Sequence, residues 1–85
     1  MPSYLVEVYL PRSQAGDANE TAQRVGATVA ELSSEGVRIR HIRTTFLPDD
    51  ETCFHLVEAS STDAVDDLCR RAGLGGARVV VAVET

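Results

Sequence analysis

Two stretches of helical periodicity, each bounded by its own start and stop signals, constrain the fold of this chain most strongly. In the first stretch, apolar residues recur at spacings of three and four, which is the period of an amphipathic helix. Asp17 and Glu20 at its beginning resemble a capping box, and Gly36 is of the residue type that commonly ends helices. The pattern predicts a helix over residues 17–35 with a buried side made of Ala22, Val25, Val29 and Leu32.

The second stretch has the same character over a shorter length. It starts in the polar segment 60–63 and stops at Gly73. Aspartates lie in its first turns and two arginines, Arg70 and Arg71, in its last turn, which is the polarity that suits the helix dipole. The pattern predicts a helix over residues 61–72 with an apolar stripe of Val65, Leu68, Cys69 and Ala72.

Four stretches rich in β-branched and aromatic residues surround these helices and predict strands. They cover residues 4–10, 37–47, 52–59 and 78–84. The resulting order, β-α-β-β-α-β, is that of a ferredoxin-like fold, in which a four-stranded antiparallel sheet carries both helices on one face. We therefore expect an α+β protein that forms one domain over residues 1–85.

Both faces of the predicted sheet are apolar, although two helices can cover only one of them. In the first predicted strand the even-numbered residues are all apolar, and the other side of the strand also carries the apolar residues Leu5 and Tyr9. Residues 79–83 are apolar on both sides. An exposed patch of this kind, on the order of several hundred Å², is more than monomers usually tolerate. We expect two copies to pack sheet to sheet as a homodimeric α/β barrel. The alternative is a ligand cleft or a partly open monomer.

The composition argues against several classes of function. The formal net charge is -5 at pH 7, so we expect no binding to nucleic acid, which would repel the chain. The chain contains no lysine, which excludes Schiff-base chemistry on a lysine side chain. The sequence has neither an apolar run that could span a membrane nor the pattern of a signal peptide. We therefore expect a cytoplasmic protein with free thiols at Cys53 and Cys69.

The few polar groups within the predicted sheet are the candidates for chemistry. Regular pairing around the turn at 48–51 sets His41 opposite Glu58. This register puts Cys53 and His55 on one face of the sheet and His41 and Glu58 on the other. A slip by one residue would instead bring His41 and His55 to the same face, and the sequence leaves both registers open.

These groups include ligand types that nickel and zinc accept. The candidate ligands for a divalent transition metal are His41, His55, Cys53 and Glu58. No CxxC, HxxxH or HExxH motif supports such a site. The structural alternatives are a His41–Glu58 pair, a packing or interface role for His55, and a small buried residue at Cys53.

Glu7 is a carboxylate in a strand that should lie in the middle of the sheet. If it is buried, it must be paired or carry a raised pKa. Glu7 or His55 is therefore the candidate general base if the chain is a small barrel enzyme, either an isomerase or a cofactor-free oxygenase. The alternative is that Glu7 lines a water-accessible cavity or forms a salt bridge between subunits.

Several short segments spread over nearly the whole chain resemble one known family. They are Tyr4–Glu7, Arg43–Phe46, Cys53 with Glu58 and Ala59, Ala64–Val65, and Arg71–Leu74. The chain is similar there to small bacterial ferredoxin-like proteins grouped with a nickel-binding, nickel-responsive homodimer. The resemblance implies a dimer and nickel binding. Many relatives carry a histidine where Leu68 stands here, which predicts weak affinity for the metal.

The sequence thus favours a non-catalytic dimer that binds a small ligand or, weakly, a nickel-type metal. Two alternatives belong to other classes of function. One is a small dimeric α/β-barrel enzyme, and the other is a structural or interaction module.

Overall fold

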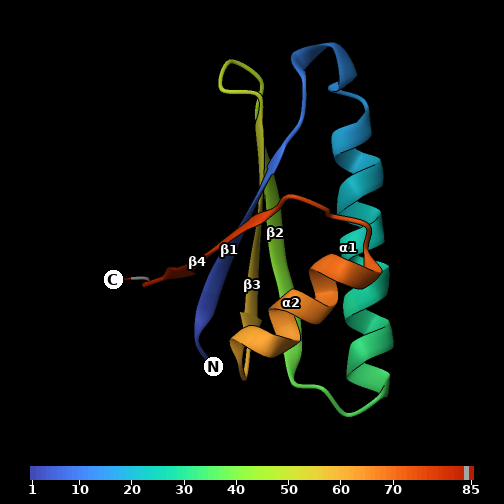
Figure 1. Cartoon of the computed structure of the whole chain (residues 1–85), viewed down its shortest axis with the longest axis vertical. Helices are drawn as coiled ribbons and strands as arrows, with labels where there is room; N and C mark the ends of the chain where they lie inside the picture. The colour runs from blue at the N-terminus through green and yellow to red at the C-terminus, as the bar shows by residue number, and fades with distance from the viewer. Residues whose placement is uncertain (84) are drawn as a thin grey trace.

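The computed structural model describes residues 1–83 and 85. Within these residues the chain forms seven elements, in the order β1, η1, α1, β2, β3, α2 and β4 (Figure 1). Their bounds are Ser3–Tyr9, Arg12–Gln14, Asp17–Ser34, Ile39–Leu47, Thr52–Ala59, Thr62–Arg71 and Arg78–Ala82, where η1 is a single 3-10 turn. The predicted order of strands and helices is confirmed. Residue 84, the predicted end of the last strand, lies outside the described residues.

The strands of the described residues form one antiparallel sheet in the order β2-β3-β1-β4, with β3 and β1 in the centre. Figure 1 shows the sheet close to edge-on, with α1 and α2 both on its right-hand side. We term this side the helix face and the opposite side the open face. The α+β architecture is consistent with the predicted ferredoxin-like fold.

The two helices begin differently from one another. The side chain of Ser61 caps α2 by accepting a hydrogen bond from the backbone N–H of Ala64 at 3.2 Å. At α1 the predicted capping box is wrong, because Gly16 occupies the N-cap position and no side chain caps the helix. The 3-10 turn η1 leads the chain directly into α1, so Asp17 is already a helical residue.

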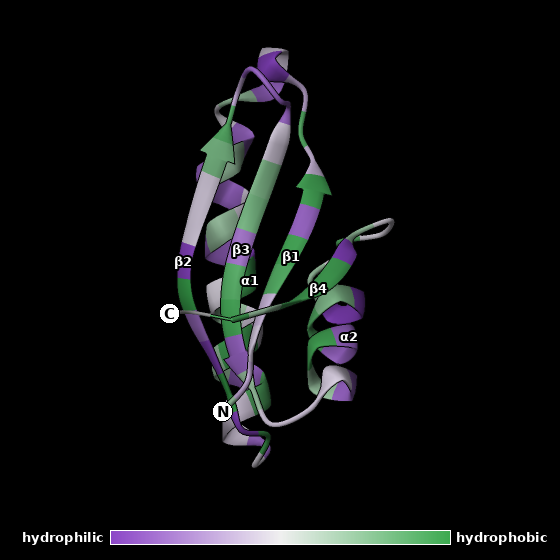
Figure 2. Cartoon of the chain, turned by 90° about the vertical axis from the view of Figure 1, so that its left-hand side faces the viewer, coloured by the Kyte–Doolittle hydropathy of each residue, from purple (hydrophilic) through white to green (hydrophobic). Residues whose placement is uncertain are grey.

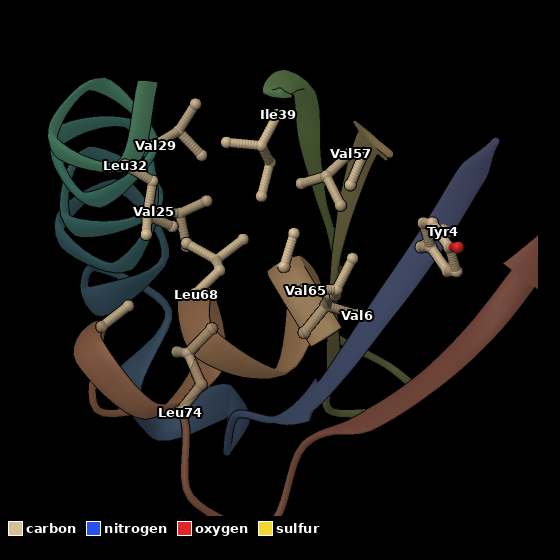
Figure 3. Close-up of a cluster of buried hydrophobic side chains, with 13 residues drawn as sticks. Tyr4, Val6, Val25, Val29, Leu32, Ile39, Val57, Val65, Leu68 and Leu74 are labelled. Carbon is tan, nitrogen blue, oxygen red and sulfur yellow. The ribbon is translucent and has the colours of Figure 1, made fainter. Parts of the chain in front are cut away.

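The core lies between the helix face and the two helices (Figure 3). Its side chains with no exposed surface include Val25 and Leu32 from α1, Val65 and Leu68 from α2, and Val6 and Val57 from the central strands. The predicted stripes of both helices therefore face the sheet, with Thr21 buried in α1 and Ala22 only partly buried.

Among the residues that the structure describes, no helix lies on the open face, and Figure 2 shows this face toward the viewer with α1 behind β2 and β3. Because side chains alternate along a strand, this face holds the β1 and β3 residues that do not contact the core. They are Ser3, Leu5, Glu7 and Tyr9 from β1 and Thr52, Phe54, Leu56 and Glu58 from β3. Leu56 is buried among its neighbours, whereas Tyr9 is largely exposed.

Over the described residues, none of the helices has the length and apolar character needed to cross a membrane.

Candidate functional site

A β-bulge in β2 decides which face the first histidine occupies. Pairing is regular from Leu47 back to Arg43, but the register shifts between Arg43 and His41, so that Ile42 is the extra residue. His41 therefore pairs with Val57 rather than with Glu58, which is opposite Arg40. The predicted His41–Glu58 pair is wrong, since His41 lies on the helix face.

Both histidines of the chain consequently meet beneath α1. His55 pairs with Val6 of β1 and with Thr44 of β2, both on the helix face. The ring centroids of His41 and His55 are 6.2 Å apart, with the ring planes inclined at 64°. Gly26 of α1 lies over His41, since a Cβ added at Gly26 would be 3.8 Å from His41 Nδ1.

A continuous series of polar atoms joins these residues. Thr44 Oγ1 is hydrogen-bonded to His41 Nε2 at 2.9 Å and to His55 Nδ1 at 2.8 Å. On the other side of the ring, His55 Nε2 lies 3.9 Å from the Sγ atom of Cys53. We term these four residues the histidine chain. The threonine was not among the sequence candidates, because a regular strand would have placed it on the opposite face from His41.

Burial keeps the histidine chain uncharged. His55 has no exposed surface, and its desolvation lowers its pKa from 6.5 to about 4, with smaller contributions from His41 when that ring is protonated and from the positive charge of Arg24. Desolvation also lowers the pKa of His41, an effect partly offset by a backbone hydrogen bond at Arg43. Burial raises the pKa of the Cys53 thiol. At pH 7 the histidine chain therefore consists of two neutral imidazoles, a hydroxyl and a thiol.

The two carboxylates proposed from the sequence lie on the other side of the sheet. Glu58 faces Arg40 across the open face, with 3.6 Å between its Oε1 and the arginine Nε. Glu7 Oε2 lies 3.7 Å from Arg78 Nη1 of β4. Of the proposed metal ligands, the structure thus brings together His41, His55 and Cys53 but not Glu58. Among residues 1–83 and 85, no three His, Cys, Asp or Glu side chains are grouped closely enough to hold a metal ion.

A cavity of about 260 Å³ lies on the helix face near the start of α1. Its walls come from the end of β1, from α1 and from the loop between α2 and β4. Three charged residues line it, namely Asp17, Glu20 and Arg24. Reasoning from the sequence missed them because they look like ordinary exposed residues of an amphipathic helix.

Comparison with protein-family models, with curated proteins and with solved structures gives no match for this chain. The functional argument therefore rests on the geometry of the chain itself.

Proposed function

We propose that this chain is a non-catalytic binding protein that acts as a homodimer and takes nickel or zinc weakly at the histidine chain. The observation that carries the proposal is the meeting of both imidazoles at one hydroxyl, Thr44 Oγ1. Neutral imidazole is the protonation state that a divalent transition metal requires of a histidine ligand. Burial lowers the pKa of both rings below the usual value for histidine, which favours the neutral state at pH 7.

Weak affinity follows from the same contacts. A metal that binds between the two rings must displace the hydroxyl of Thr44, which engages one nitrogen of each ring. Cys53 offers a thiol with a raised pKa, and its deprotonation opposes binding. Tight sites usually have three or four convergent protein ligands. Glu58, on the open face, does not contribute one.

The dimeric state is proposed from the open face. Leu5, Phe54 and Leu56 form its apolar centre, flanked by the Arg40–Glu58 and Glu7–Arg78 pairs. Paired charges of both signs around an apolar centre can complement a second copy of the same surface related by a two-fold axis. We therefore take a second copy of this chain as the occupant of the open face.

The enzymatic alternative has less support. Its two candidate bases, Glu7 and His55, lie on opposite faces of the sheet. A general base works best when its pKa is near the working pH, and the pKa of His55 is about 4. Glu7 is held beside Arg78. These features favour binding over proton transfer.

Isothermal titration of the full chain with nickel and with zinc tests the metal proposal. We expect saturable binding with a Kd well above micromolar, lost in His41→Ala and in His55→Ala. The chain has two histidines in all, so the variant that carries both His41→Ala and His55→Ala should show no heat of metal binding to a histidine. Thr44→Ala removes the hydroxyl that is hydrogen-bonded to His41 Nε2 and His55 Nδ1, so this variant should bind the metal more tightly than the wild type does. A stoichiometric submicromolar site, or binding that persists without both histidines, would contradict the proposal.

A further inference from the structure

The cavity beside the start of α1 has the size and lining of a small-molecule site. Its volume of about 260 Å³ is slightly below the ~300 Å³ at which pockets for drug-sized ligands begin. One wall is apolar and is formed by Val8, Leu10 and Leu74, of which the two leucines are buried. Leu74 belongs to the α2–β4 loop, and the glycines on either side of it, Gly73 and Gly75, also line the cavity.

The charged wall of the cavity comes from α1. Asp17, Glu20 and Arg24 are spaced by three and four residues and therefore share one side of the helix. Glu20 and Arg24 have the spacing of a common helical ion pair. Nevertheless, none of the three residues takes part in an ion pair within residues 1–83 and 85. Their charges are thus available to a ligand in the cavity.

The spacing of these charges suggests the shape of the ligand. With a rise of about 1.5 Å per residue, Glu20 and Arg24 are separated by about 6 Å along the helix axis. A guanidinium binds a carboxylate through two parallel hydrogen bonds, and carboxylates bind an ammonium group. A ligand that satisfies both has its opposite charges at the two ends of a short aliphatic chain.

We propose that the cavity binds a short ω-amino carboxylate. Its carboxylate lies at Arg24, and its ammonium group lies at Glu20 and Asp17. Its methylene groups pack against Leu10 and Leu74. This inference concerns a different site and a different ligand class from the metal proposal and does not depend on it.

Titration of the ¹⁵N-labelled full chain with 5-aminopentanoate, followed by NMR, tests the inference. We expect saturable shifts of the backbone amides of residues 73–75 and of the first turns of α1. Pentanoate and pentylamine have the same chain with one charge each, and we expect each to bind about tenfold more weakly or worse, because one charge-assisted contact is lost.

Two matched variants locate the carboxylate. Arg24→Gln should weaken 5-aminopentanoate binding by about tenfold and leave pentylamine binding unchanged. Arg38→Gln removes another exposed arginine, which does not line the cavity, and should change neither. Both positions are exposed, so the dispersion of the amide spectrum should report a folded protein in each case.

Three results would overturn the inference. The first is the absence of saturable shifts with 5-aminopentanoate. The second is a set of shifts confined to the open face. The third is equal or tighter binding of norvaline, an isomer of the probe whose two charged groups are attached to the same carbon. None of these results depends on a metal, so failure here is distinguishable from failure of the metal proposal.

Discussion

At the scale of single residues, the unusual feature is the burial of polar groups under α1. His55 is the largest polar side chain without exposed surface, and it lies among apolar core residues. Such a group is tolerated when its hydrogen-bonding atoms have partners. Thr44 and Cys53 provide them, one on each side of the ring. The histidine chain should therefore matter for stability as well as for binding.

The first prediction concerns pH. The pKa of His55 is about 4 in the folded protein against 6.5 in the unfolded chain, so the unfolded chain binds the proton first as the pH falls. The free energy of unfolding should therefore be fully retained above pH 6.5 and should decrease by about 3 kcal/mol as the pH approaches 4. The lowered pKa of His41 acts in the same direction. Urea unfolding of the wild type and of His55→Asn at several pH values measures this, and equal losses in both proteins would contradict it.

The second prediction concerns Thr44. Thr44→Val keeps the shape of the side chain but leaves His55 Nδ1 without its hydrogen-bond partner. An unsatisfied buried polar group costs about 1–3 kcal/mol, so we expect a loss of roughly 2 kcal/mol in the free energy of unfolding. Thr44→Ser should restore most of it. Ser13→Ala, which removes an exposed hydroxyl from η1, is the control and should change stability by less than about 0.5 kcal/mol. Equal losses of stability at the two positions would show that the Thr44 hydroxyl has no structural role of its own.

At the scale of elements, two glycines of the α1 region have different structural roles, one just after the end of the helix and one in its middle. Gly36 follows α1 with a φ of 91°, a left-handed conformation that other residues adopt at a cost. Gly26 lies within the helix, where a Cβ would make an ordinary contact at 3.8 Å with His41. The same substitution should therefore have opposite effects at the two positions.

The third prediction follows from this contrast. Gly36→Ala should lower the free energy of unfolding by about 1 kcal/mol, because alanine is strained at positive φ. Gly26→Ala should raise it by about 0.5–1 kcal/mol, because alanine favours a helix interior. Thermal or urea unfolding of both variants provides the measurement. A destabilised Gly26→Ala would mean that α1 packs more closely on His41 than the contact distance indicates.

The elements were more predictable from the sequence than the site. Both helices could be placed because their apolar stripes, which include Val25, Leu32 and Leu68, stop at the glycines that follow each helix, although the capping box expected at the start of α1 is absent. The faces of β2 could not be derived, because counting by alternation assumes an unbroken strand. Ile42 is β-branched and apolar and carries no sign of a bulge. The position of His41, and with it the role of Thr44, therefore required the structure.

At the scale of the whole molecule, the two faces of the sheet are unequally covered. α1 and α2 cover the helix face, whereas no helix within residues 1–83 and 85 covers the open face (Figure 2). On the open face the apolar side chains of Tyr9 and Leu47, which both pair with Thr52, remain exposed. These features are the basis of the proposed dimer.

The fourth prediction is the mass in solution. Light scattering at micromolar concentration should give about twice the 9.1 kDa of one chain. Phe54→Glu places a charge at the centre of the open face and should give the mass of one chain while the helical signal is kept. Ala27→Glu adds the same charge at an exposed position on α1 and should leave the dimer intact. A wild-type mass of one chain would exclude the sheet-to-sheet dimer.

The hydroxyl between the two imidazoles has a consequence for where the protons lie. Thr44 has one proton to donate and a hydrogen bond on each side, so it donates to one ring and accepts from the other. If it donates to His55 Nδ1, the proton of neutral His55 is on Nε2, facing Cys53, and His41 donates from its own Nε2. If it donates to His41 Nε2, His55 carries its proton on Nδ1 and its Nε2 is free to accept from the thiol of Cys53. The tautomers of the two histidines are thereby coupled, so that a change of tautomer at one ring reverses the direction of the entire row of hydrogen bonds.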